Sequence, residues 1–409
     1  MKVAIVTHYF PPEIGAPQAR LSDLARLWSG DGHDVHVITG MPNHPTGVVP
    51  DRYRRRLRVR ERIDGYRVTR CWLYATPNEG VVKKTMGHLS FMVSSALIGP
   101  WKLGRPDVVV VSSPTFFSIG SAWLLARLKR ARFVVEVRDL WPAIFVELGV
   151  LTNPAAIRLL ERLELAAYRA ADRVVVVSEG FRDHITQRGI PAGKVVTIRN
   201  GVDLDRFTPA LPVEEHIRRR LGAADGELLV LYIGAHGISQ GLRAVVQAAE
   251  KLQDAPVHVA LVGEGADKAA VVAEIERLGL RNVSTHPGVD RDIVPAVVAA
   301  ADICLVPLRD VPLFSTFIPS KMFELLAAGK PVIGSVRGEA ASILDDAGAV
   351  VVPPEDPVAL ADAVRALLDD QPRRRAMGVE GRRYVEAHFD RRTLAAQYSR
   401  MMSEMVAGQ

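Results

Sequence analysis

The stretch from Pro319 to Val332, PSKMFELLAAGKPV, follows an apolar run at residues 301–308 that is typical of a strand buried on both faces of a parallel sheet. The proline–serine pair can begin a helix, and the glycine and proline near the end of the stretch can stop one. The pattern therefore predicts a strand that leads into a helix of about two and a half turns. Strands that alternate with helices in this way build an α/β fold.

Two charged side chains of this stretch, Lys321 and Glu324, are three residues apart and therefore share one face of the predicted helix. They would lie where the carboxyl end of a strand meets a helix N-terminus, which is where open α/β sheets bind phosphorylated ligands. The lysine suits a phosphate, and the glutamate suits the hydroxyl groups of a ribose. The alternative is an ordinary solvated pair on a crossover helix.

The same succession of strand, glycine-bearing turn and helix runs through both halves of the chain, which predicts parallel sheets built from right-handed βαβ units. In the first half, strands are expected at 2–7, 34–39, 107–112, 132–137, 173–178 and 194–199, and helices at 16–30, 83–101, 117–130, 154–171 and 180–188. In the second half, strands are expected at 228–234, 257–262, 282–286, 302–307, 331–335 and 349–352.

The regular pattern is interrupted from the N-G-V-D sequence at 200–203 to the proline at residue 212. A chain of 409 residues is also too long for a single core. We therefore expect two doubly wound domains, residues 1–205 and 206–384, and a helix at 385–409 that crosses back to the first domain. The default ligand site of such a pair is a cleft between the carboxyl edges of the two sheets.

The composition, 48% hydrophobic and 24% charged, is a normal balance for a soluble globular protein. Two cysteines, Cys71 and Cys304, lie far apart in the sequence, which favours reduced thiols in the cytoplasm over a disulfide framework or a metal cluster. The opening residues are typical of a strand rather than a signal peptide, and the longest apolar segment, 89–101, is shorter than the roughly 18–20 residues that span a bilayer. We expect a cytoplasmic protein without a transmembrane helix.

The net charge of +6 comes from one segment. Between Arg52 and Arg62 there are seven arginines and one glutamate, which alone sum to +6, so the remainder of the chain is neutral. A basic footprint for nucleic acid along the chain is therefore absent. The segment could bind an anionic membrane surface, or it could form a strand with one arginine-rich, solvated face.

A second candidate for membrane contact is the segment Val81–Trp101, which combines Lys83, Lys84 and His88 with an apolar helix that ends in tryptophan. Together with the Arg52–Arg62 segment it could dock the first domain on anionic lipid, at the inner face of the plasma membrane. A helix that packs in the core is the alternative.

The first predicted strand is followed by the sequence THYFPPEIGA, in which Gly15 opens the first helix. A glycine at this place lets a backbone N–H group approach an anion closely. The sequence is not G-x-G-x-x-G, so a nicotinamide cofactor is not indicated. An ordinary loop glycine is the alternative.

Four motifs occur in a fixed order: the glycine loop at Gly15, N-G-V-D at 200–203, the G-E-G sequence at 263–265, and P-S-K-x-x-E-x-x-A-x-G-K-P-V at 319–332. As a set they resemble the retaining glycosyltransferases of family 4, over nearly the whole chain. The resemblance implies the GT-B fold, two Rossmann-like domains that face each other across a cleft.

Two further segments narrow the resemblance. The sequence EVRDLWP at 136–142 and the glycine loop GAHGISQG at 234–241 resemble the bacterial branch that builds surface polysaccharides, which includes N-acetylfucosamine and colanic-acid transferases.

The family's donor-binding roles can be carried onto this chain by its motifs. Glu324 matches the second glutamate of the family's E-x7-E motif, which holds the donor ribose, whereas the first glutamate falls at Thr316. Lys321 would neutralise the donor diphosphate, and the amide of Gly15 would approach the same group. The arginine and lysine that the family usually carries after the first strand of its second domain are replaced around Ala235 and Gln240, so Lys321 carries more of the charge.

Two more positions belong to the predicted donor site, which comprises Gly15, Gln240, Glu264, Val289, Thr316, Lys321 and Glu324. Glu264 is the middle residue of G-E-G, and Val289 ends the turn HPGV at 286–289, whose backbone commonly reads the base edge in the family. A purely structural turn is the alternative for Val289.

On the acceptor side, Arg138 and Asp139 occupy the place where many relatives carry a histidine, at the end of a buried strand. A charged pair there is costly unless it is paired or faces a cleft. Arg138 could hold a phosphate or an acceptor anion, and Asp139 could orient an acceptor hydroxyl. A structural ion pair that caps the following loop is the alternative.

The resemblance implies retention without a carboxylate nucleophile, because the leaving diphosphate oxygen can take the acceptor proton. It also implies no metal: Asp203-Leu204-Asp205 has the D-x-D form of metal-dependent transferases of another fold, but it belongs to the N-G-V-D junction.

The sequence therefore predicts an enzyme that moves a hexosyl or N-acetylhexosaminyl group from a nucleotide diphosphate sugar, most simply a UDP-sugar, to a lipid-linked saccharide. The alternatives are a nucleotide-sugar epimerase of similar architecture, a transferase that acts on a small molecule, and a binding module without catalysis. An epimerase would need further acid and base side chains, and a binding module could lose Lys321 and the loop at Gly15.

Overall fold

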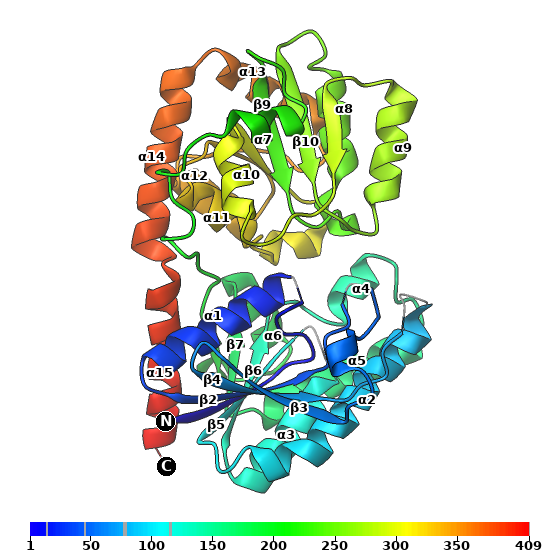
Figure 1. The fold of residues 1–409 in the computed structure, drawn as a ribbon, viewed down its shortest axis with the longest axis vertical. Coiled ribbons are helices and arrows are strands. Elements are labelled where there is room, and N and C mark those ends of the chain that lie inside the picture. The colour runs from blue at the N-terminus through cyan, green and yellow to red at the C-terminus, as the bar shows by residue number, and fades with distance from the viewer. Residues whose placement is uncertain (14, 45, 77–79, 114–116, 409) are drawn as a thin grey trace. The chain divides into compact units, whose positions relative to one another are not determined.

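The computed structural model describes residues 1–13, 15–44, 46–76, 80–113 and 117–408. The chain forms two compact units, drawn in Figure 1. The N-terminal unit comprises residues 1–199 and 392–409, and the C-terminal unit comprises residues 200–391. Each unit is an α/β structure built on its own sheet, as the alternating pattern predicts.

The sheet of the N-terminal unit has eight strands in the order β3-β4-β2-β1-β5-β6-β7-β8. Their bounds are β1 Lys2–Val6, β2 Asp34–Gly40, β3 Arg58–Ile63, β4 Tyr66–Cys71, β5 Val108–Ser112, β6 Arg132–Val137, β7 Arg173–Val176 and β8 Val195–Thr197. All pairs are parallel except β3 with β4, which is antiparallel. The sheet is therefore mixed: the predicted parallel strands are joined at one edge by the antiparallel strand β3.

The antiparallel edge is a hairpin whose turn is Asp64-Gly65, both with positive φ (43° and 87°). Asp-Gly is the pair that such two-residue turns favour, because both positions must adopt a left-handed conformation. Along β3 the exposed side chains are Arg58, Arg60 and Arg62, which alternate with more buried neighbours. The interpretation of this segment as a strand with one arginine-rich face is confirmed.

The helices of the N-terminal unit cover both faces of this sheet, which are lined by valine, isoleucine and aromatic side chains. Their bounds are α1 Ala16–Gly30, α2 Gly80–Lys102, α3 Ser118–Lys129, α4 Ala143–Glu147, α5 Pro154–Ala170, α6 Glu179–Gln187 and α15 Arg391–Ala407. The last helix packs on the first: the rings of Trp28 and Tyr398 lie 5.1 Å apart, and Trp28 Nε1 donates a hydrogen bond to the carbonyl of Ala395.

The sheet of the C-terminal unit has six parallel strands in the order β11-β10-β9-β12-β13-β14. Their bounds are β9 Leu228–Ile233, β10 Val257–Val262, β11 Val283–His286, β12 Ile303–Pro307, β13 Val332–Ser335 and β14 Val350–Val352. The helices are α7 Glu215–Arg220, α8 Leu242–Glu250, α9 Lys268–Leu278, α10 Val294–Ala300, α11 Lys321–Ala327, α12 Glu339–Asp346, α13 Pro357–Leu368 and α14 Gln371–His388.

In both sheets the strand order reverses next to the first strand of the unit. β1 lies between β2 and β5, and β9 lies between β10 and β12. Connections leave opposite faces of the sheet at such a point and open a crevice at the carboxyl ends of the strands. The loops that follow β9 and β12 therefore flank this crevice in the C-terminal unit.

Candidate functional site

Lys321 is the first residue of α11, which follows β12 after a short 3-10 helix, Pro312–Thr316. Its Nζ atom lies 3.8 Å from the centroid of the Tyr232 ring on β9 and 3.5 Å from Gln240 Oε1. Burial lowers the pKa of Lys321 to about 7, although the carboxylate of Glu324 acts in the opposite direction. The ammonium group therefore has one weak hydrogen bond and an aromatic face, a setting that an anion would complete.

The place of Lys321 depends on Gly234, the residue that follows β9. Gly234 has a φ of 146°, and a Cβ atom built on it would lie 2.6 Å from Lys321 Nζ. Any other residue would therefore push the lysine aside and strain the backbone. Tyr232, two residues earlier, donates a hydrogen bond to the carbonyl of Ala235 at 2.5 Å and so holds the turn in place.

The loops after β9 and β10 are in direct backbone contact. A Cβ atom on Gly263 would lie 1.8 Å from the carbonyl oxygen of Gly234, and one on Gly265 would lie 2.3 Å from that of His236. The amide of His236 donates to the carbonyl of Glu264 at 2.9 Å. The two glycines of the G-E-G motif are thus explained by close packing of the two loops.

Glu324 lies one turn deeper in α11. Burial raises its pKa, while Arg391, Arg291 and Arg206 nearby act in the opposite direction. Lys321 is also close enough to lower this pKa. The structure therefore brings Lys321 and Glu324 to one face of a helix at the carboxyl edge of the sheet, beside Gln240.

The other predicted donor residues of this unit lie on neighbouring loops. Glu264 is largely exposed and pairs with Lys268 at 2.7 Å, a contact that is the main cause of its lowered pKa. Thr316 ends the short 3-10 helix and donates from Oγ1 to the carbonyl of Leu313 at 2.7 Å. Val289 lies in the loop between β11 and α10 and is partly buried.

Two residues of this site are absent from the predictions, Tyr232 and His236. His236 is fully buried beside Tyr232, with ring centroids 5.7 Å apart, and neither ring nitrogen has a hydrogen-bond partner. Burial, followed by the charge of Lys268, lowers the pKa of His236 to about 4, so it stays neutral near pH 7. His236 lies in the GAHGISQG segment, but no local pattern assigns either residue its contacts, because their neighbours come from distant parts of the chain.

In the N-terminal unit, Arg138 and Asp139 follow β6 directly. The amide of Arg138 donates to Ser113 Oγ at 3.0 Å. Burial raises the pKa of Asp139 to about 6, although Arg138 acts in the opposite direction. A half-buried carboxyl group whose pKa is raised to about 6 is a candidate to accept a proton or orient a hydroxyl group.

A buried ion pair lies beneath these residues. Arg20 of α1 donates from Nε to Glu136 Oε1 at 2.8 Å, and its guanidinium also reaches the carbonyls of Ile198 and Arg199. Burial alone would raise the pKa of Glu136, but Arg20 and Arg138 hold it below the usual value. The glutamate of the EVRDLWP segment, Glu136, therefore has a structural partner.

Gly15 stands at the N-cap of α1, with no side chain capping the helix. Its extended backbone is open to any residue, but a Cβ atom there would lie 2.4 Å from Gln18 Oε1. That amide oxygen is buried and has no hydrogen-bond partner. Because Gly15 and Lys321 belong to different units, the structure places each of them only within its own unit.

The carboxyl end of β1 carries a cluster of histidines that the predicted donor and acceptor sites do not include. The rings of His8 and His88 lie 4.3 Å apart, and His44 contacts the intervening Tyr9 at 5.4 Å. Burial, followed by the charge of His88, lowers the pKa of His8. The Nδ1 atoms of both His8 and His88 are buried without partners.

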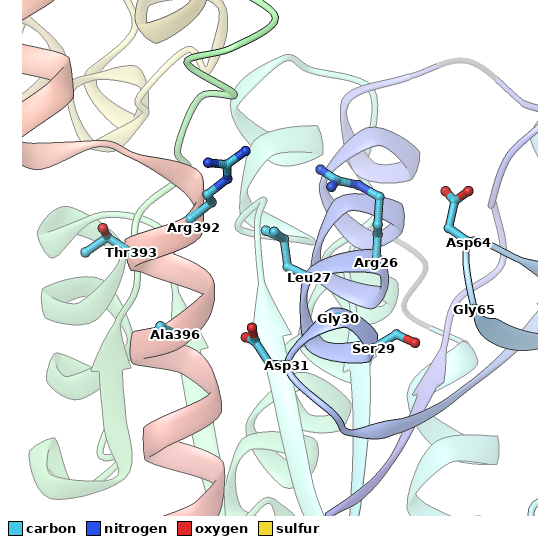
Figure 2. A pocket seen from close by; sticks show the side chains of 10 residues that line it. All are labelled: Arg26, Leu27, Ser29, Gly30, Asp31, Asp64, Gly65, Arg392, Thr393 and Ala396. Atoms are coloured by element: carbon cyan, nitrogen blue, oxygen red, sulfur yellow. The ribbon is translucent and has the colours of Figure 1, made fainter.

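A separate concavity of about 830 Å³ lies between the end of α1, the turn of the β3–β4 hairpin and the start of α15 (Figure 2). Its charged side chains include Arg26, Arg392, Asp31 and Asp64, which carry both signs. None of the predicted site residues lines it.

Among the residues that the structure describes, no group of three or more histidine, cysteine, aspartate or glutamate side chains is arranged to hold a metal ion. The D-x-D sequence at 203–205 has a structural role: Asp203 Oδ1 accepts hydrogen bonds from the amides of Asp205 and Arg206, each at 3.2 Å.

Two protein families together match most of this chain. Residues 15–201 match the family described as glycosyl transferase 4-like domain, and residues 213–384 match glycosyl transferases group 1. The chain is a GT-B glycosyltransferase. It is similar to the Escherichia coli (strain K12) protein that carries the provisional name colanic acid biosynthesis glycosyl transferase WcaI. The two sequences are 27% identical over 410 residues, which cover 97% of this chain and 98% of that one.

Solved structures share the fold of this glycosyltransferase. Sucrose-phosphate synthase from Thermosynechococcus elongatus superposes with a TM-score of 0.79 at 21% identity, over the whole of both chains. Anabaena HepE in complex with UDP and glucose superposes with a TM-score of 0.74 at 18% identity, over 98% of this chain and 99% of that one. Within the described part of the glycosyltransferase, none of the helices is both long and apolar enough to cross a membrane.

Proposed function

We propose that this glycosyltransferase moves a sugar, with retention of anomeric configuration, from a UDP-sugar to a lipid-linked saccharide during the synthesis of a bacterial surface polysaccharide. The observation that carries the proposal is the pair Lys321 and Glu324 on one face of α11, at the carboxyl edge of the second sheet. A cation and a carboxylate at this spacing suit the diphosphate and the ribose of a nucleotide sugar.

Lys321 would meet the donor diphosphate, because its ammonium group has only one weak hydrogen bond at 3.5 Å and is poised over the Tyr232 ring. Glu324 would accept hydrogen bonds from the ribose hydroxyls, and the loop at Val289 would face the base. Gly15 would offer a backbone amide to the same diphosphate. Support for a uridine donor comes from the related fold of HepE, which binds UDP and glucose.

In the reaction proposed, the bond between the anomeric carbon and the diphosphate oxygen breaks, and a bond to the acceptor oxygen forms on the same face of the sugar. The acceptor proton passes to the departing phosphate oxygen, so no protein nucleophile and no metal ion are needed. Lys321 stabilises the charge that grows on the diphosphate. Asp139 orients the acceptor hydroxyl, and Arg138 holds an acceptor anion.

The acceptor proposed is a saccharide carried on a lipid, as the similarity to the colanic acid protein suggests. Such an acceptor is anchored in a bilayer, so the enzyme would work in the cytoplasm at the inner face of the membrane. A phosphate on such an acceptor would pair with the cationic Arg138 beside Asp139.

The proposal is tested by incubating the purified protein with UDP-, GDP- and ADP-linked sugars and an extract of lipid-linked saccharides. We expect transfer from a UDP-sugar to the lipid fraction, with an anomeric configuration, determined by NMR, that matches the donor. Transfer only from GDP- or ADP-sugars would contradict the donor assignment. Transfer to water-soluble sugars alone would contradict the acceptor assignment.

A further inference from the structure

Helix α2 of the N-terminal unit exposes a stripe of large apolar side chains. Leu89, Val93, Leu97 and Trp101 recur at every fourth position and are 38%, 52%, 67% and 83% exposed. Residues at this spacing share one face of a helix. Soluble monomers rarely expose a contiguous apolar stripe of this length, so a surface of this kind marks an interaction site.

The stripe forms one wall of a groove of about 1060 Å³, whose other wall is the start of β3 and the segment after β4. Leu57 and Trp72, 75% and 43% exposed, complete the apolar lining. Hydrogen bonds hold the two walls together: Ser94 Oγ donates to the carbonyl of Trp72 at 2.5 Å, and the amide of Tyr74 donates to Ser90 Oγ at 2.7 Å. The groove is therefore part of the fold.

Cations surround this groove. Arg56 and Arg58 line it, and Arg60 is exposed on the same strand. Lys102 lies at the end of α2, near these arginines. Burial, followed by the charges of Arg58 and Arg60, lowers the pKa of Lys102. The sequence of α2 contains no aspartate or glutamate, so the helix adds only positive charge.

Two acidic groups near the start of β3 and within it, Asp51 and Glu61, are already paired. Glu61 accepts hydrogen bonds from Arg70 at 2.6 Å and from Tyr53 at 2.7 Å. Asp51 pairs with Arg54 at 2.8 Å. Among the residues that the structure describes, the apolar stripe thus has a cationic border beside two paired carboxylates, which is complementary to a surface that is apolar within and anionic at its rim.

We propose that this face, formed by α2 and strand β3, docks the enzyme on an anionic phospholipid bilayer, an inference that rests on the proposed lipid-linked acceptor. The apolar stripe enters the boundary between headgroups and acyl chains, and the arginines and Lys102 meet the phosphates. A second copy of the chain fits less well, because a two-fold interface would bring the same arginine-rich surface against itself.

The opposite face of α2 has a different composition. Phe91 is buried in the unit, and His88 contacts His8 at the carboxyl end of β1. Since a helix with its side chains is about 10 Å wide, docking through α2 would hold the carboxyl end of β1 within roughly that distance of the bilayer. A lipid-linked sugar would then reach this edge of the sheet without leaving the membrane.

The test is co-sedimentation of the full-length protein with vesicles of phosphatidylglycerol and phosphatidylcholine, compared with phosphatidylcholine alone. Two double variants probe the face: Val93→Glu with Leu97→Glu, and Arg58→Ser with Arg60→Ser. Matched controls in the C-terminal unit are Val379→Glu on α14, 72% exposed, and Arg219→Ser with Arg220→Ser on exposed positions of α7. Circular dichroism and UDP titration check that each variant is folded.

We expect the wild type and both controls to bind the anionic vesicles, and more weakly at high salt. The arginine variant should lose roughly fivefold in partitioning for each charge removed, and the apolar variant at least about tenfold. Quenching of tryptophan fluorescence by bromine-labelled lipid should be reduced in Trp101→Phe, which reports insertion without disturbing the fold.

Wild-type partitioning by both face variants would overturn the proposal, as would a failure of the wild type to bind anionic vesicles. A dimer that the apolar variant disrupts without any change in vesicle binding would instead make this face an interface between copies. Vesicle binding does not depend on the donor, so loss of UDP binding with intact docking would contradict the proposed function and leave this inference standing.

Discussion

The ammonium group of Lys321 on α11 lies 3.8 Å from the centroid of the Tyr232 ring on β9, a contact across the point where the strand order of the second sheet reverses. No carboxylate hydrogen-bonds to this lysine in the described structure, and burial lowers its pKa to about 7. This arrangement supports the proposed role of Lys321 in binding a donor diphosphate. The predictions below follow from it and from the carboxyl edge of the first sheet.

The affinity for UDP should fall as the pH rises above about 7. Below the pKa of about 7 the free enzyme already carries the charged lysine, whereas above it binding must take up a proton. The apparent affinity then falls by up to roughly tenfold per pH unit, until the pKa of the complex is reached. Calorimetry in two buffers of different ionisation enthalpy measures this proton uptake directly.

The control for this pH dependence is Lys321→Met, which should bind UDP weakly and equally between about pH 7 and pH 9. His236 should not contribute, because its pKa is lowered to about 4, and burial keeps Tyr232 protonated throughout this range. An unchanged pH dependence in Lys321→Met would show that another group takes up the proton.

Gly234→Ala should weaken UDP binding at least about tenfold, because the added Cβ would lie 2.6 Å from Lys321 Nζ and displace it. Unfolding should be easier by about 1–3 kcal/mol, since φ is 146° at this position. The matched control is Gly226→Ala, where φ is 86° and a Cβ meets nothing within 4 Å. The control should lose stability but keep its UDP affinity; equal affinities in the two variants would contradict the packing argument.

Glu324→Gln should reduce the preference for ribose. A hydrogen bond to a charged group contributes about 1.5–3 kcal/mol, so UDP affinity should fall roughly tenfold to a hundredfold. The wild type should prefer UDP to 2′-deoxy-UDP, and the variant should bind both alike. Titration with both nucleotides makes this comparison. A variant that still prefers UDP as strongly as the wild type would remove Glu324 from the ribose site.

Protonation of Asp139 should slow the reaction at acidic pH. Its pKa is raised to about 6, so the carboxylate that orients the acceptor hydroxyl is lost as the pH falls below that value. The kcat/KM for the acceptor should decline below about pH 6 in the wild type. The variant Asp139→Asn should lower kcat about a hundredfold, and its kcat/KM should no longer decline at acidic pH. Donor affinity serves as the control. A purely structural Asp139 would leave the shape of the pH profile unchanged.

Much of the fold could be predicted because buried parallel strands are continuous apolar runs. Residues 132–137 and 257–262 are predicted strands whose bounds are those of β6 and β10. The hairpin of β3 and β4 is harder to predict from the sequence, because β4 carries the polar residues Arg67, Thr69 and Arg70 and is not a continuous apolar run. Arg70 is only 1% exposed and pairs with Glu61, a contact that no local pattern shows. The Asp64-Gly65 turn was the available signal.

The candidate site likewise contains residues that a local sequence pattern predicts and residues that it does not. Lys321 and Glu324 could be placed on one helix face because their spacing is local. Tyr232 and His236 could not, because their contacts with Lys321, Gly263 and Lys268 depend on how β9, β10 and β12 are ordered in the sheet. Pairings of this kind arise from topology rather than from neighbouring residues.

The central claim, that Lys321 holds the donor diphosphate, is tested most directly by calorimetric titration of UDP and of uridine into the wild type and Lys321→Ala. The control variant is Lys251→Ala, an exposed lysine at the end of α8. We predict that Lys321→Ala weakens UDP binding roughly tenfold to a hundredfold and leaves uridine binding unchanged, while the control behaves as the wild type. Unchanged UDP affinity in Lys321→Ala would contradict the account.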